Sequence, residues 1–203
     1  MSIRRALPLG LSVLVLAGCA LGPRPTLVDV AEVDDAAANA VLERLDRTPN
    51  QAFTATYDIA PAAASARTIA TVHRSIDGTT ETRIGDVVFT SYPNGTSTTC
   101  DPIGEGCDEY TNDARVSDLS ITNRFWGPAF EQRLRTDVSR RIGPSEGSTV
   151  TIGDQSATCV TVSVPSPIEA VGAVVYCALD IGVLARYVGA DVVIELTSFQ
   201  IDG

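Results

Sequence analysis

His73 is the only histidine in the chain, and any Ser–His–Asp chemistry would depend on it. In such a triad the imidazole takes the proton of the serine hydroxyl, while a carboxylate holds the ring in place. No serine of the sequence lies in a G-x-S-x-G motif or another nucleophile pattern. His73 stands between Val72 and Arg74 in a segment with strand character, where a histidine commonly faces solvent or a hydrogen-bond partner. We therefore expect that the chain is not an enzyme.

Two pairs of adjacent acids, Asp34–Asp35 and Asp108–Glu109, are the other candidates for acid–base or metal chemistry. Adjacent side chains on a helix or a strand point in different directions, which disfavours a shared site. The sequence contains no D-x-D-x-D-G calcium loop. We interpret both pairs as helix-start charges or solvated surface, and the sequence predicts neither a metal nor a cofactor.

The chain begins with the three parts of an export signal. Arg4 and Arg5 give a positive start, residues 6–16 are apolar, and Leu16-Ala17-Gly18-Cys19 follows. The apolar run is too short to span a bilayer, so we expect residues 1–18 to be a signal peptide. The tetrad resembles the bacterial lipobox, which implies cleavage after Gly18 and a diacylglycerol on the sulfur of Cys19. An ordinary signal peptide with an incidental cysteine is the alternative.

Acylation of Cys19 would decide where the mature chain resides. Two or three acyl chains, such as palmitate, hold a protein on a membrane durably, whereas a single chain holds it only marginally. We therefore expect a lipoprotein anchored on the outer face of the cell membrane. Residues 19–33, which contain Gly22 and Pro23, form a short tether, and residues 34–203 form a single domain.

The charge of the chain excludes two classes of partner. The net charge is −10 and there is no lysine, and loss of Arg4 and Arg5 with the signal peptide makes the mature chain still more acidic. Such a surface repels nucleic acid and anionic lipid headgroups, so we expect neither as a partner. The sequence identifies no protein partner. An arginine-only, alanine-rich composition is compatible with a GC-rich, actinobacterial source.

Hydrophobic periodicity predicts one helix, four strands, a helical insert and five further strands. Residues 34–47 have helical spacing and end before Pro49, whereas from Phe53 onward apolar residues alternate with polar ones, as in half-buried strands. Strands linked by short turns, without alternating helices, indicate an antiparallel sheet. The expected strands are 53–59, 68–75, 81–92, 96–100, 148–152, 157–164, 174–179, 183–188 and 192–199.

The helical insert is expected to begin at Pro128, which suits the first position of a helix. Four apolar residues then recur at every fourth position and would face one side, and Gly143–Pro144 would end the helix. Trp126 lies beside Phe125 just before this helix, where it forms a core or lid cluster or contacts a ligand. The recurring residues are Phe130, Leu134, Val138 and Ile142.

Four cysteines remain after Cys19, and in an oxidising compartment they are expected to form two disulfides. Three pairings are possible. A hairpin that turns near Ile168 places Cys159 opposite Cys177 and makes its other face uniformly apolar, and a one-residue slip would spoil both features. That face consists of Val160, Val162, Val164, Val174 and Tyr176.

The remaining pair is then Cys100–Cys107, across a loop that contains a proline and two glycines. A metal or redox site is the alternative use of these cysteines. Neither spacing is C-x-x-C, and one histidine cannot complete a tetrahedral ligand set, so we expect structural disulfides.

The layout resembles the LolA-like lipoprotein-carrier superfamily, which includes actinobacterial lipoproteins that carry lipids or glycolipids. The resemblance lies in the opening strand Phe53-Thr54-Ala55-Thr56-Tyr57, in the central helical insert, and in the closing run from Leu179-Asp180-Ile181-Gly182-Val183-Leu184 to Glu195-Leu196-Thr197-Ser198-Phe199. It implies an N-terminal helix before an antiparallel, unclosed (half) β-barrel, with helices packed into the concave face. The cysteine pairs and the 5% aromatic content depart from the family, and no ligand residue can be transferred from it.

Two functional hypotheses follow. The first is a binder or carrier of acyl chains or lipids in an apolar concave cavity covered by the helix that bears Phe130 and Leu134. The second is an envelope interaction or sensor module without a small ligand. A cavity of several hundred cubic ångströms would favour the first, and a cavity plugged by Phe125, Trp126 and Phe130 the second. The expected cavity residues are Phe53, Tyr57, Val160, Val162, Val174, Tyr176, Ile194 and Leu196.

Overall fold

The computed structural model describes residues 33–47, 49–61, 67–101, 106–116, 122–166 and 171–202, with only the backbone of Arg124, Pro128 and Ala129. The expected signal peptide, Cys19 and nearly all of the tether lie outside these ranges. So do the centre of the loop between Cys100 and Cys107 and the turn around Ile168. Every described residue belongs to the unit formed by residues 32–203.

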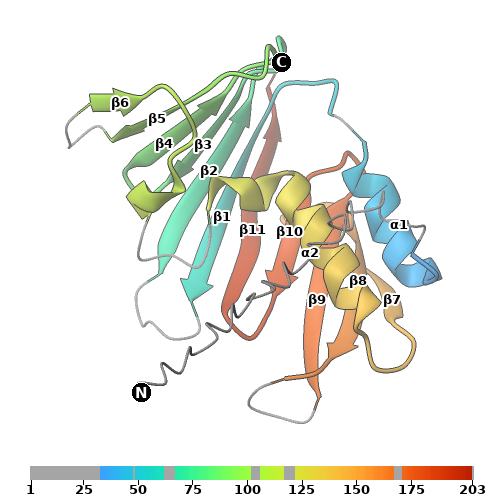
Figure 1. The fold of residues 1–203 in the computed structure, drawn as a ribbon. Coiled ribbons are helices and arrows are strands. Elements are labelled where there is room, and N and C mark those ends of the chain that lie inside the picture. The colour runs from blue at the N-terminus through green and yellow to red at the C-terminus, as the bar shows by residue number, and fades with distance from the viewer. Residues whose placement is uncertain are drawn as a thin grey trace, which may run out of the picture. The chain divides into compact units, whose positions relative to one another are not determined.

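An antiparallel sheet of eleven strands forms the frame of this unit (Figure 1). The strand order is β6-β5-β4-β3-β2-β1-β11-β10-β9-β8-β7, so β1 pairs with the last strand and the two edges are β6 and β7. The sheet is therefore unclosed. Its strands are β1 (Phe53–Pro61), β2 (Thr68–Arg74), β3 (Thr80–Ile84), β4 (Val87–Ser91), β5 (Ser97–Asp101), β6 (Gly106–Asp108), β7 (Glu146–Ile152), β8 (Gln155–Val164), β9 (Gly172–Leu179), β10 (Leu184–Val188) and β11 (Val192–Ile201).

Two irregularities in neighbouring strands affect the middle of the sheet. In β11 the register against β1 skips Thr197, and in β10 the register against β9 skips Ala185. An extra residue of this kind bends its strand and increases the local twist. Both irregularities lie in or beside strands that carry some of the largest buried side chains.

The prediction of a single strand over residues 81–92 was wrong. The chain turns at Gly85, which has a φ of 58°, and β3 and β4 pair as a hairpin on either side. A positive φ at the first of two central residues is the pattern of a tight hairpin turn. Strand β6 was not predicted, because three residues show no usable periodicity.

Helix α1 (Ala36–Leu45) begins at Asp35, whose carboxylate accepts a hydrogen bond from the N–H of Ala38 at 2.9 Å. The same carboxylate lies 3.2 Å from the guanidinium of Arg141 and 3.3 Å from the N–H of Ser145. Burial opposes ionisation of Asp35, but these bonds and Arg141 outweigh it and lower its pKa. Asp35 thus joins the start of α1 to the segment that follows α2.

Helix α2 (Pro128–Ser139) lies between β6 and β7 in the chain and begins at the expected proline. It is preceded by the short 3₁₀ helices η1 (Asp113–Val116) and η2 (Asn123–Trp126). The helix ends at Ser139, so its expected extension to Ile142 was wrong. The N–H of Ile142 instead bonds the carbonyl of Ser163, and its side chain is 46% exposed. Within the described ranges, no helix has the length and apolarity needed to cross a membrane.

The two disulfides have the expected pairing. Cys159 lies opposite Cys177 in the β8–β9 hairpin, with 4.0 Å between their Cα atoms, and Cys100 lies opposite Cys107 between β5 and β6. The predicted hairpin register also holds along its length, since Val160 pairs with Tyr176 and Val162 with Val174.

One face of the sheet, here called the inner face, is the face that carries Tyr176. The pairings place a continuous row of buried side chains on it, because directly opposed residues share a face. The row is Ile59, Ile194, Tyr187, Tyr176 and Val160.

Candidate functional site

Helix α2 lies over one face of the sheet (Figure 1), and α2 and η2 carry apolar side chains that contact the inner face. The four-residue spacing aligns Phe130, Leu134 and Val138 on one stripe of the helix, and all three are buried. Phe125, in η2, is buried with them, and Trp126 packs at the edge of the same cluster.

Four rings form what we call the aromatic cluster: Phe125, Phe130, Tyr176 and Tyr187. Their centroids lie 5.2 Å apart for Tyr176 and Tyr187, 5.3 Å for Phe130 and Tyr176, and 5.2 Å for Phe125 and Tyr187. Tilted and edge-on contacts at these distances are favourable beyond the area that they bury. The cluster fills the space between α2 and the middle of the inner face.

A buried carboxylate bounds the cluster on the C-terminal side of α2. Asp137 is only 3% exposed, and its carboxylate accepts a hydrogen bond from the hydroxyl of Tyr176 and contacts Arg140 at 2.6 Å. Burial, followed by this hydrogen bond, raises the pKa of Tyr176. The tyrosine therefore stays neutral and acts as a donor, and the buried charge of Asp137 is compensated.

Arg133 closes the cluster toward solvent. Its guanidinium carbon lies 4.7 Å from the centre of the Tyr187 ring and 5.5 Å from that of Phe125, and the group contacts Asp191 at 2.5 Å. Burial opposes its charge, but the bond to Asp191 and the neighbouring groups outweigh this and raise its pKa. A cation over two ring faces is stabilised by both.

Beside the cluster the inner face stays open, in what we call the α2 cleft. Its volume is about 610 Å³, and it lies between the C-terminal half of α2, the ends of β8 and β9, and the turn between β10 and β11. Its walls are mainly apolar on the sheet side, whereas every lining residue on the helix side is polar or charged. They include Arg133 and Thr136 from α2, Arg140 just after it, Val164 at the end of β8, Pro165 just after that strand, Val174 near the start of β9, and the turn 189–191.

The eight residues that we expected to line a cavity all lie on the inner face and are all buried. Most of them face packed side chains: Tyr176, for example, contacts Phe130 instead of open space. Val174 borders the α2 cleft, and Phe53 and Tyr57 border a cleft of about 110 Å³. Contact of these residues with a ligand stays a prediction. The eight are Phe53, Tyr57, Val160, Val162, Val174, Tyr176, Ile194 and Leu196.

Trp126 lies between that small cleft and a second one of about 310 Å³. Its ring lies 5.6 Å from that of Tyr57, whose hydroxyl donates to the carbonyl of Leu184. The indole N–H of Trp126 is buried and has no hydrogen-bond partner among the described groups. Of the aromatic trio, Phe125 and Phe130 are thus buried against the middle of the inner face, whereas Trp126 lies at the edge of the cluster.

His73 lies in a small polar cluster at the end of β2. Its Nδ1 is 3.4 Å from the carboxylate of Asp202 and 3.1 Å from the hydroxyl of Thr54, which donates to the same carboxylate at 3.0 Å. Its Nε2 is 3.3 Å from the hydroxyl of Ser75. The order Ser75–His73–Asp202 is that of a hydrolase triad, but His73 is nearly half exposed and none of these residues lines the clefts described above. The cluster joins the end of β11 to β1 and β2.

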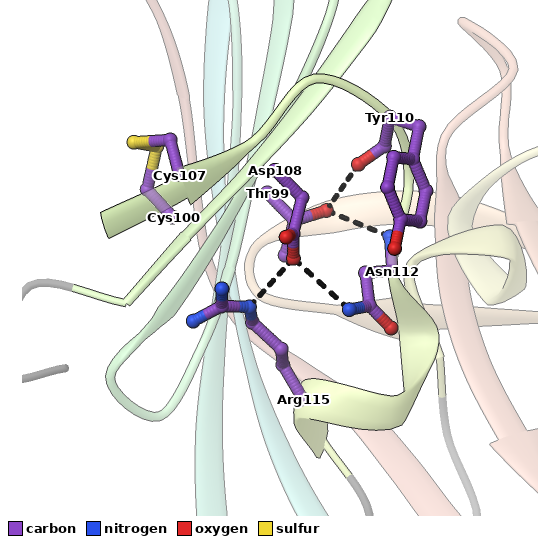
Figure 2. Close-up of a disulfide and its surroundings, with 7 residues drawn as sticks. All are labelled: Thr99, Cys100, Cys107, Asp108, Tyr110, Asn112 and Arg115. Carbon is purple, nitrogen blue, oxygen red and sulfur yellow. Dashed lines mark hydrogen bonds and ion pairs between the residues drawn. A yellow bond between two sulfur atoms is a disulfide. The ribbon is translucent and has the colours of Figure 1, made fainter. Parts of the chain in front are cut away.

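The two acid pairs have separate structural roles. Asp35 caps α1, while Asp108 receives hydrogen bonds from Arg115 at 2.7 Å and from Asn112 at 2.9 Å (Figure 2). The bond from Arg115, followed by that from Asn112, lowers the pKa of Asp108. Figure 2 shows this network beside the Cys100–Cys107 disulfide, where the buried hydroxyl of Thr99 donates to the carbonyl of Tyr110 and accepts from the N–H of Asn112.

A metal centre has no support in this part of the chain. Among the residues that the structure describes, no group of three or more histidines, cysteines or acids has the arrangement needed to hold an ion.

Comparisons with known proteins find similarity only at the level of solved structures. No family model matches the chain, and no curated protein matches it. MucB aligns over 84% of this chain and 60% of its own, with 10% identity and a TM-score of 0.47. The MucA/MucB complex of Pseudomonas aeruginosa aligns over 82% of this chain and 57% of that one, with 10% identity and a TM-score of 0.40.

A LolA superfamily protein, NE2245 from Nitrosomonas europaea, aligns over 82% of this chain and 94% of its own, with 10% identity and a TM-score of 0.38. The neighbours thus include a member of the superfamily that the sequence resembles. This chain spans little more than half the length of the MucB chains. Alignments at these TM-scores carry no argument about function, which has to come from the site.

Sequence reasoning found the aromatic residues of α2 but missed the cleft beside them. Arg133 and Asp137 in α2 and Asp191 in a turn belong to no recognised motif, and no prediction was made for them. A signal was present near the turn of the β8–β9 hairpin, where Val164 pairs with Gly172 and Ser163 with Ala173, because small residues leave room. Its meaning depended on where α2 crosses the sheet.

Proposed function

We propose that this chain is an extracytoplasmic lipoprotein that binds a slender apolar group, such as an acyl chain, in the α2 cleft. The observation that supports this is the cleft itself. Its volume of about 610 Å³ falls in the range of small-molecule sites, which also combine apolar walls with a few polar groups.

The charges around the cleft favour an apolar ligand. Arg133 is paired with Asp191, and Arg140 with Asp137, so neither arginine is left without a counter-ion. The sheet wall offers the side chains of Val164 and Val174. A ligand that gains mainly by leaving water fits this wall better than a highly charged one.

Thr136 allows the cleft to be filled from the helix without disturbing the core, because it is exposed on α2 and borders the cleft. Thr136→Trp should weaken the binding of a fluorescent fatty acid by about tenfold or more, which corresponds to about 1.4 kcal/mol. Ser139→Trp is the matched control, since Ser139 is also exposed on α2, and both hydroxyls bond a preceding carbonyl, but Ser139 does not border the cleft.

The control variant should bind like the wild type, and both variants should melt like the wild type. Equal binding by Thr136→Trp and Ser139→Trp would place the ligand elsewhere. Absence of binding by the wild-type protein would remove the ligand-binding function altogether.

The membrane anchor forms a separate part of the proposal and rests on the lipobox sequence. Cys19→Ala should abolish the incorporation of labelled palmitate and leave unprocessed precursor. Continued incorporation into that variant would refute the anchor while leaving the cleft untouched.

An envelope interaction module without a small ligand is the second candidate. It is favoured by the aromatic cluster, which fills the middle of the inner face where the first hypothesis required a cavity. We propose no catalytic role for the Ser75–His73–Asp202 cluster, since His73 is nearly half exposed and none of the three residues lines the clefts described above.

A further inference from the structure

The two edges of the sheet are protected to different degrees. Edge β6 has three residues and is covalently joined to β5 through Cys107 and Cys100. Edge β7 has seven residues, of which the first six are exposed, and it pairs without irregularity along its whole length with β8. Natural edge strands are usually shortened, bulged, charged, interrupted by proline or covered by another element to prevent pairing. Among the described residues, β7 has one charge, on Glu146, and α1 packs against it at Gly147, but its first six residues stay exposed.

The hairpin turn determines which backbone groups of β7 face outward. Gly153 and Asp154 both have positive φ, 56° and 62°, as in a two-residue turn of the primed type, which is closed by a hydrogen-bonded pair. That pair is Ile152 and Gln155. Since hydrogen-bonded and non-bonded pairs alternate in antiparallel strands, the backbone groups directed away from β8 are those of Gly147, Thr149 and Thr151.

These outward groups are arranged symmetrically about Thr149. We propose that β7 is a homodimer interface, in which it pairs antiparallel with β7 of a second copy in a register centred on Thr149. Thr149 then pairs with the partner's Thr149, and Gly147 with the partner's Thr151. In this register the N–H and C=O groups of all three outward residues find partners.

Side chains and charge favour a second copy as the occupant. The centred register places Thr149 opposite itself, Ser148 opposite Val150 and Glu146 opposite Ile152, so no like charges face each other. The whole chain has a net charge of −10, which opposes association through most of its surface, whereas β7 offers seven residues with a single charge. This inference is independent of the α2 cleft and of its ligand.

Cysteine cross-linking of the full chain tests the register directly. In a hydrogen-bonded pair the Cα atoms lie about 5.5 Å apart, within disulfide reach, whereas diagonal neighbours lie at about 7–8 Å. Thr149→Cys in detergent-solubilised full chain should therefore give a covalent dimer under mild oxidation. Ser148→Cys, one residue away and also exposed, should give several-fold less, while a mixture of Ser148→Cys and Val150→Cys should restore the cross-link.

A second variant tests the interface without added thiols. Proline is tolerated at an edge position whose N–H faces solvent, so Thr149→Pro should keep the fold but lose the central donor. By light scattering coupled to size-exclusion chromatography, the wild-type dimer fraction should rise with concentration, and that of Thr149→Pro should not.

Four outcomes would overturn the proposal: a wild-type chain that is monomeric at every concentration, equal cross-linking from positions 148 and 149, a Thr149→Pro variant that dimerises like the wild type, and a different protein bound to β7 in place of a second copy.

Discussion

The two halves of α2 cover two different regions of the same inner face. Under its N-terminal half, the large rings of Phe125, Phe130, Tyr176 and Tyr187 are buried and pack against one another. Beside its C-terminal half, valines, alanine and glycine leave the α2 cleft of about 610 Å³. The backbone is continuous through both regions, so the difference is one of side-chain volume. The size of the side chain at each position therefore determines whether that part of the inner face is packed or left open.

Asp137 stands at the boundary between the two regions. Its carboxylate binds the hydroxyl of Tyr176 on the filled side and Arg140 on the open side. A buried, partnered acid at this point fixes the position of α2, because a shift of the helix would leave the carboxylate of Asp137 buried without its partners. We infer that the cluster and Asp137 hold the helix in place, and that the cleft exists because the helix is held.

The largest expected effect comes from emptying the filled region. Phe130→Ala removes a ring that is 2% exposed and should lower the free energy of unfolding by about 3–5 kcal/mol. Thr136→Ala, on the exposed cleft side of the same helix, should change it by less than about 0.5 kcal/mol. Chemical denaturation of both variants measures the contrast, and similar losses would show that the two regions do not differ in packing.

A smaller effect is expected at the boundary. Asp137→Ala leaves the buried hydroxyl of Tyr176 without its acceptor and should cost about 1–3 kcal/mol. Adding Tyr176→Phe to this variant removes the stranded hydroxyl, so the double variant should be less destabilised than the sum of the two single ones. Strict additivity in denaturation experiments would mean that the two groups do not interact.

The smallest effect should come from a site outside both regions. Asp35→Ala removes the cap of α1 and should cost about 1 kcal/mol near neutral pH. Because folding lowers the pKa of Asp35, its contribution is complete above the unfolded pKa of about 3.9 and disappears as the pH falls through the folded value. The difference in stability between the two proteins should therefore shrink below about pH 4. A constant difference from pH 7 to pH 2 would show that ionisation of Asp35 is not involved.

The strand framework could be predicted where two independent signals coincided. The β8–β9 register followed from the cysteine pair and from the apolar face that the same register creates. Pro128 gave the start of α2 and period four gave its buried stripe, but Ile142 continues that period by coincidence beyond the true end of the helix. The turn at Gly85 was missed because strand-forming residues continue on both sides of it.

The candidate site could be predicted only in part. The inner-face residues followed from period two, because alternation determines which side chains share a face. Their environment did not follow, since the packing of Phe130 on Tyr176 depends on the angle at which α2 crosses the sheet. The α2 cleft is built from three segments that are distant in the sequence and contain small residues. No local sequence pattern indicates that these segments will come together and leave a cleft.

The most direct test of the α2 cleft is photolabelling of the full chain with a diazirine-bearing fatty acid, followed by peptide mapping. Binding in the α2 cleft predicts label on the segment of α2 around Thr136 and on the start of β9 around Val174, and suppression of both by excess unlabelled fatty acid. Competed label confined to other segments, or no competed label anywhere, would contradict it.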